Sequence, residues 1–221
     1  GAGTSLGVTG RRGTSTGDTT SANASLSWRR EFTGDDHNLT LALERGRWTS
    51  DNESDFRLDM LAPTGPSAFE VTDGRYASST LGFKGDYSRP MPASGRLKAG
   101  FDYQQTEDDS DDTVLTGPTA GSVVVDPARS HRVVFDETVL SGYLTYERPF
   151  GDLTVLGGMR MESAENEINL LTTGLTTRHR YDRVYPSLHL DYRLSDTSRL
   201  KASYALRIRR PSSLRIGMFC K

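Results

Sequence analysis

The chain of 221 residues is long enough for one or two globular domains, but only 34% of its residues are apolar and its mean hydropathy is -0.56. A large conventional core is therefore hard to assemble. A β-barrel, in which only alternate strand residues need be apolar, fits this composition, and so does a loosely packed soluble protein. With 27 basic and 29 acidic residues the net charge is -2, which excludes a whole-chain positive field for nucleic acid.

Alternating apolar and polar residues define the predicted strands of the first half. Residues 1–20 are rich in Gly, Thr and Ser and predict a strand end followed by a loop. Two-residue periodicity then predicts strands at residues 21–32, 38–48, 77–87 and 96–105. Short turns are expected at residues 33–36 and 89–95, and a long loop with a short strand at 56–61 is expected over residues 50–76.

The second half repeats this arrangement. Strands are predicted at residues 133–147, 153–162, 184–194 and 200–208, with short turns at 148–152 and 195–198. Long loops are expected over residues 106–130 and 163–180. The result is eight long strands, or nine if the first residues count, with short turns on the periplasmic side and long loops outside.

The final predicted hairpin indicates what these strands face. Leu188, Leu190 and Leu194 share one face of its first arm, while His189 and Asp191 share the other. Each arm alternates for about ten residues, the length of a tilted strand that crosses a bilayer, whereas ordinary globular strands have about five or six. Charge along the whole polar side suits a wet lumen. The pattern predicts an all-β, antiparallel transmembrane β-barrel wall with its apolar side on hydrocarbon.

The same hairpin carries a family resemblance. Residues 185–212 read YPSLHLDYRLSDTSRLKASYALRIRRPS, which resembles a hairpin of TonB-dependent outer-membrane receptors with the pattern YPSL.L.Y.L…L..SY..R..RP. The matching positions are Tyr185, Pro186, Ser187, Leu188, Leu190, Tyr192, Leu194, Leu200, Ser203, Tyr204, Arg207, Arg210 and Pro211. The match covers roughly an eighth of the chain, and the ending from Ser212 to Lys221 departs from the asparagine-proline-phenylalanine-like continuation of such receptors.

The resemblance implies that residues 1–221 are a segment, a partial barrel, of a TonB-dependent receptor in the outer membrane of a Gram-negative bacterium. Such receptors bind substrate at the loops and inner wall, and TonB pulls on a plug domain. No plug or TonB-contacting box is recognisable here, and the chain begins Gly-Ala-Gly without a signal peptide, so we expect the plug, further strands and an export signal outside it. The implied partners are outer-membrane lipid, the plug, TonB through the plug, and a small-molecule substrate.

Substrates of the resembling family include ferric siderophores, vitamin-like cofactors and oligosaccharides. A row of basic residues near the end of the chain, with His189, is the candidate substrate site at the lumen or mouth, suited to an anionic ferric chelate. Its members are Lys201, Arg207, Arg209, Arg210 and Arg215. The alternative, which we favour for this row, is pairing with inward carboxylates such as Asp191 or Glu162.

Catalytic and cofactor motifs are absent from the sequence. It has no G-x-S-x-G elbow, P-loop, H-E-x-x-H or Rossmann glycine pattern, so we predict neither an enzyme nor a cofactor. The single Cys220 and four scattered histidines predict no zinc site. The acidic run from Glu107 to Asp112 offers oxygen ligands to calcium, but it lacks the glycine and distal glutamate of a calcium loop, and we interpret it as a solvated loop.

Two other architectures remain open at this point. Eight strands also permit a complete small barrel that acts as a passive pore or an adhesion protein. A soluble all-β binding domain would instead pack Leu188, Leu190, Leu200 and Leu206 against a second sheet.

Overall fold

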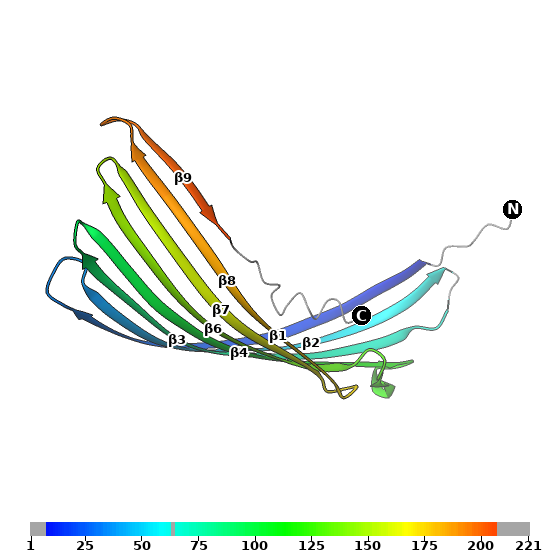
Figure 1. The fold of residues 1–221 in the computed structure, drawn as a ribbon. Helices are drawn as coiled ribbons and strands as arrows, with labels where there is room; N and C mark the ends of the chain where they lie inside the picture. Colours follow the sequence, from blue (N-terminus) through cyan, green and yellow to red (C-terminus); the bar gives the residue numbers. More distant parts are fainter. Residues whose placement is uncertain (1–7, 63–64, 207–221) are drawn as a thin grey trace.

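The computed structural model describes residues 8–62 and 65–206, which form one antiparallel sheet (Figure 1). Each long strand pairs with its neighbours along the chain, in the order β1-β2-β3-β4-β6-β7-β8-β9, and β5 pairs with β4 off this path. The strands are β1 (Val8–Glu31), β2 (Asn38–Ala62), β3 (Ala68–Met91), β4 (Gly95–Gly117), β5 (Val124–Val125), β6 (His131–Phe150), β7 (Leu153–Leu170), β8 (Leu175–Arg193) and β9 (Arg199–Ala205). A 3-10 helix, η1 (Ala120–Ser122), precedes β5.

The predicted fold class and the eight long strands are confirmed, but the predicted loops are largely wrong. Residues 50–62 continue β2, residues 106–117 continue β4, and residues 163–170 and 175–180 extend β7 and β8. Residues 8–20 likewise belong to β1 instead of a loop. The prediction failed there because it recognised a strand by apolar residues on one side. In these additional segments the side that is apolar in the predicted strands carries mostly polar residues instead.

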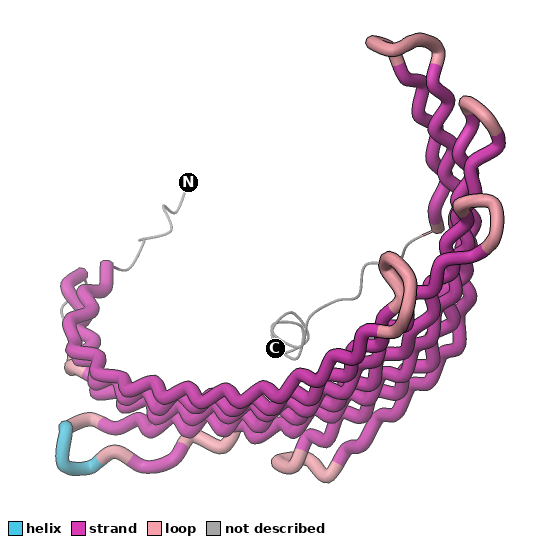
Figure 2. The backbone as a smooth tube through the Cα atoms, turned by 90° about the vertical axis from the view of Figure 1, so that its left-hand side faces the viewer, coloured by secondary structure: helices cyan, strands magenta, loops and turns pink. Residues whose placement is uncertain are grey.

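The sheet is curved and open. Figure 2 shows it as a trough, with β1 and β9 at its two edges. Among the described residues, no pairing joins these two edges and no second sheet packs on this one. The described part of the chain therefore forms neither a closed eight-stranded barrel nor a sandwich.

Curvature distinguishes the two faces of the sheet. On β6, Val139 and Ser141 are 6% and 3% exposed, while Leu140 between them is 53% exposed. Side chains on a concave surface converge and cover one another, whereas those on a convex surface diverge. Leu140 therefore lies on the convex face, and Val139 and Ser141 lie on the concave face.

The convex face carries a continuous apolar band. One cross-strand row contains apolar side chains from five strands in succession: Leu26, Leu43, Phe83, Tyr103 and Leu140. The alternation of the final hairpin is also as predicted, because Leu188 pairs with Tyr204, and Tyr204 and Leu206 are 60% and 49% exposed. On β7 the band runs from Leu153 to Met161, about 26 Å of strand, or about 22 Å in height when tilted, close to the roughly 25 Å band of membrane barrels.

Aromatic residues near the short turns step regularly from strand to strand. Trp28 is level with Gly85 across β2, and Tyr87 lies two residues farther along β3. Tyr87 is in turn level with Leu144, and Tyr146 lies two residues farther along β6. A step of about 6.6 Å along the strands for about 9.6 Å across two of them means that the line through these three rings slopes by about 35° from the perpendicular to the strands, which equals the strand tilt of closed barrels.

Beyond the apolar band the strands continue as a polar extension, which begins at the cross-strand row that contains Arg47, Glu107 and Asp136. In this extension the polarity of the two faces is reversed. Its convex face carries Glu107, Asp136 and Glu167 side by side, and burial together with the neighbouring Glu107 and Glu167 carboxylates raises the pKa of Asp136. Its concave face carries Trp48, Phe135 and Ile168 in one row. The extension therefore turns its charges outward, as a sheet in water does.

Candidate functional site: the concave wall

The concave face of the apolar band is a lattice of paired polar groups. The Lys84 ammonium lies 2.6 Å from the Glu44 carboxylate on the neighbouring strand, and Arg160 lies 3.6 Å from Glu162. The Tyr143 hydroxyl donates a 2.5 Å hydrogen bond to Asp86. Long charged side chains of both signs on this face neutralise one another, so the wall is polar without a strong net field.

The predicted basic row lies only partly within the described residues. Lys201 on β9 is on the concave face, where its ammonium lies 3.5 Å from Asp191 on β8, and Arg199 lies 4.0 Å from the same carboxylate. His189 also lies on this face, opposite Ser203. Arg207, Arg209, Arg210 and Arg215 lie outside the described residues. Lys201 thus has the carboxylate partner that the pairing alternative expects, and its role in substrate binding stays a prediction.

Sequence analysis missed an aromatic recess on the concave face of the polar extension. The rings of Trp48 on β2 and Tyr76 on β3 meet edge to face, with centroids 5.1 Å apart. Short polar side chains and a carboxylate line the recess around them: Ser50, Asn52, Ser78, Ser110 and Asp112. Trp48 and Ser78 stand at the ends of predicted strands, but the other residues of the recess fall in segments predicted as loops. Along β2 the alternation continues from Leu43 through residues 44–56, which could have placed Trp48, Ser50 and Asn52 on one face.

A second polar cluster, also missed, fastens the 118–130 connection to the sheet. Glu70 on β3 is only 8% exposed, and two arginines bind it: Arg129 at 2.6 Å and Arg11 at 3.2 Å. The Arg11 guanidinium also lies 3.5 Å from the centre of the Phe56 ring. The hydrogen bond from Arg129 holds the pKa of Glu70 below its usual value. Through Arg129 the connection is therefore tied to the concave side of β3.

The acidic run is part of a strand and not the solvated loop that its charge predicts. It lies within β4, so its side chains alternate: Glu107, Asp109 and Asp111 are on the convex face, and Asp108 and Asp112 are on the concave face. Carboxylates on opposite faces cannot surround one ion. Among the described residues, no group of three or more His, Cys, Asp or Glu side chains is placed to hold a metal.

Comparison with known proteins decides the family. Residues 30–217 match the outer membrane protein beta-barrel family. The chain belongs to this family. Family membership places the sheet in the outer membrane of Gram-negative bacteria. A search of curated protein sequences found no match to the chain. Among the described residues, no helix is long and apolar enough to cross a membrane.

Solved structures of similar shape are receptors for iron complexes. The ferric-catecholate import receptor Fiu from E. coli K12 in an open form matches 86% of this chain with a TM-score of 0.56 and 11% identity. The ferric citrate transporter FecA matches 77% with a TM-score of 0.46 and 15% identity, and the ferric yersiniabactin receptor FyuA from Yersinia pestis matches 75% with a TM-score of 0.44 and 11% identity. The chain covers only 35%, 28% and 28% of these three proteins.

The family and the Fiu likeness together explain the reversed faces. The described sheet is a partial, open wall with the fold of a receptor barrel, and its apolar band faces lipid. The polar extension stands beyond the membrane, and the concave face of both regions lines the interior.

Proposed function

We propose that this chain forms part of the wall of a TonB-dependent receptor that takes up a scarce substrate such as a ferric siderophore. The observation that carries the proposal is the concave wall itself, polar and charge-paired within the band and aromatic beyond it, on a sheet with the fold of a ferric-catecholate receptor. A wall that alternates this way is suited to an aqueous interior.

The two open edges of the sheet indicate that further strands pair with it. Backbone groups along the outer sides of β1 and β9 have no ladder partner among the described residues, and lipid does not tolerate such edges. We infer that further strands complete the barrel, that a plug domain fills it, and that TonB acts through the plug. The proposed activity is therefore transport by the assembled barrel, with no chemical step on the substrate.

The aromatic recess and the predicted basic row have different places in this proposal. Trp48 and Tyr76 lie on the concave face of the extension, where a substrate arriving from outside first meets the wall. His189 and Lys201 lie on the concave face of β8 and β9 at the level of the membrane, along the path inward. We propose that the recess binds substrate and that the later residues contact it during passage.

Energised uptake tests the proposal most simply. Cells that carry the protein are compared with cells that lack it for uptake of radiolabelled ferric siderophore, with and without an uncoupler of the proton-motive force. The proposal predicts uptake that needs both the protein and the proton-motive force. Uptake that needs the protein but persists with the uncoupler would instead indicate a passive pore.

A pair of tryptophan variants tests the wall. Trp48→Ala removes the recess ring, while Trp28→Ala removes a ring from the convex face at the opposite end of the sheet. We expect Trp48→Ala to weaken ferric siderophore binding about tenfold, since stacking on one ring contributes on the order of 1 kcal/mol or more, and Trp28→Ala to leave it unchanged. Equal binding by wild type and Trp48→Ala would show that the recess does not bind the substrate.

A further inference from the structure

Three hairpins approach their short turns through the same convex-facing pattern. An aromatic residue is followed two positions later by an arginine and two positions after that by Phe or Met. The three sets are Trp28-Arg30-Phe32, Tyr87-Arg89-Met91 and Tyr146-Arg148-Phe150. Because side chains two apart in a strand share a face, each arginine lies on the convex face just below the apolar band.

Register places the three arginines at one depth. Arg30 is level with Tyr87 across β2, and Arg89 lies two residues beyond Tyr87. Arg89 is level with Tyr146 across β4, and Arg148 lies two residues beyond Tyr146. A line through the three arginines therefore slopes by about 35° from the perpendicular to the strands. Strands of membrane barrels are tilted by about this angle, so the line runs parallel to the membrane plane.

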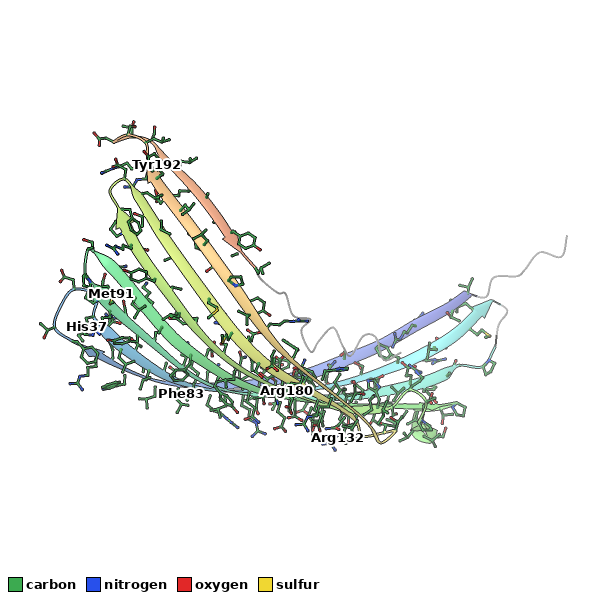
Figure 3. All side chains as sticks on the ribbon, in the orientation of Figure 1. His37, Phe83, Met91, Arg132, Arg180 and Tyr192 are labelled. Carbon is green, nitrogen blue, oxygen red and sulfur yellow. The ribbon has the colours of Figure 1, made fainter. Side chains whose placement is uncertain are left out.

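The fourth hairpin breaks the pattern. Arg148 is level with Leu190 across β7, because both pair with Val155. The same two-residue step along β8 leads to Tyr192, so a tyrosine stands where the line of arginines would continue. Figure 3 shows Tyr192 at the same end of the sheet as Met91 and His37, with Arg132 toward the other end. The arginines therefore form a band along β1 to β6, which we call the arginine collar.

The collar has no carboxylate partner within the described part of the chain. Of the nineteen described arginines, twelve lie within 4.0 Å of a carboxylate, and Arg30, Arg89 and Arg148 are among the seven that do not. The guanidinium carbons of Arg30 and Arg148 lie 5.2 and 5.1 Å from the ring centres of Phe32 and Phe150. A guanidinium that rests its flat face on a ring keeps its N–H donors at the edge for an anion.

We propose that the arginine collar binds the phosphate groups of anionic phospholipid headgroups in the leaflet at the short-turn end. A lipid whose chains cover the apolar band carries its phosphate at the level where the band ends, and the collar is continuous with that band. Phosphate oxygens match the fork of guanidinium donors. Positive charge near a membrane surface contributes on the order of 1 kcal/mol per residue toward anionic lipid.

Lipid selectivity measures the collar directly. The protein is reconstituted into phosphatidylcholine vesicles that contain a trace of spin-labelled phosphatidylglycerol or, in parallel, spin-labelled phosphatidylcholine, and the immobilised fraction of each label gives their relative association with the protein. We expect wild-type protein to prefer phosphatidylglycerol. The triple variant Arg30→Gln, Arg89→Gln, Arg148→Gln should lose at least about fivefold of this preference, and the three matching lysine substitutions should keep most of it.

Arg12→Gln is the matched control, because Arg12 lies on the same face of β1 as Arg30 but far beyond the apolar band. Its lipid preference should equal that of wild type. An unchanged preference in the triple variant, or an equal loss in Arg12→Gln, would overturn the proposal. Wild-type protein supplies a second readout: the preference must fall when sodium chloride is raised from 50 to about 500 mM, since salt screens exposed charges, and a preference that does not respond to salt would also overturn it.

Discussion

The apolar band and the polar extension are made from the same strands, yet their faces carry opposite polarity. On β6, Leu140 and Leu144 are convex in the band, whereas Phe135, only 8% exposed, is concave in the extension. No bulge interrupts the pairing of β6 with β7 between these positions, so the exchange lies in the sequence. One continuous strand thus passes from lipid into water, and in each region the hydrophobic residues lie on the face that is shielded from water.

A charge placed on the convex face should separate the two regions most strongly. Leu144→Arg puts a guanidinium in the apolar band and should destabilise the protein by up to about 4 kcal/mol in vesicles, the cost of Arg in hydrocarbon at the midplane. Val134→Arg puts the same side chain on the same face of β6 in the extension, opposite Asp109, and should cost almost nothing. Urea unfolding from lipid vesicles measures both losses of stability. Equal losses would contradict the claim that the convex face meets lipid in the band and water in the extension.

Removing an aromatic ring should have the opposite dependence on region. Phe135→Ala opens a cavity among concave side chains and should cost about 3 kcal/mol, the usual loss for a buried Phe. Phe83→Ala, in the band, should cost clearly less, because lipid tails replace the lost contacts of a ring that is 40% exposed. The same unfolding experiment tests the order, and a larger cost at Phe83 would contradict it.

The Glu70 cluster should respond to pH. The pKa of Glu70 is lowered in the folded protein by Arg129, so its stabilising effect is complete above the ordinary glutamate value of 4.5 and is lost as pH falls through the folded value. Glu70→Gln should remove about 1–2 kcal/mol of local stability and with it this pH dependence. Hydrogen exchange over residues 118–130 reports the docking. Faster exchange near pH 4 than at pH 6 is expected in wild type only, once the intrinsic pH effect is corrected.

Exposed ion pairs in the extension should contribute least. Arg75 lies 2.9 Å from Asp51 on the convex face, and both side chains are largely exposed. Arg75→Ala should leave the unfolding midpoint unchanged, because water and salt screen such pairs. A clear loss of stability would mean that the convex charges of the extension are shielded from water.

The sequence predicted the band well and the extension poorly, for a physical reason. Lipid favours apolar residues at the convex positions of a spanning strand, so the alternation of Leu39, Leu41 and Leu43 indicates both the strand and its outward face. In the extension neither face meets lipid, and β2 continues through Ser50, Asp51 and Asn52, residues that favour turns. Pairing with β1 and β3 holds these residues extended, and that tertiary effect overrides their local preference.

The candidate site was predictable to a lesser extent. Concave placement of Lys201 and His189 followed from alternation alone. The recess brings together Trp48 and Tyr76, which are 28 residues apart in the sequence, and the Glu70 cluster joins β1, β3 and the connection before β6. Contacts between such distant residues need the strand pairing, which no single alternating segment specifies.

The central claim is that the convex face of the band touches hydrocarbon while its concave face touches water. Spin labels placed one at a time at residues 139–144, with Cys220 changed to serine, report collision with oxygen, which concentrates in lipid, and with a water-soluble nickel chelate. Labels at positions 140, 142 and 144 should collide mainly with oxygen, and labels at 139, 141 and 143 should collide mainly with the chelate. The same ratio at all six positions, or the opposite alternation, would contradict it.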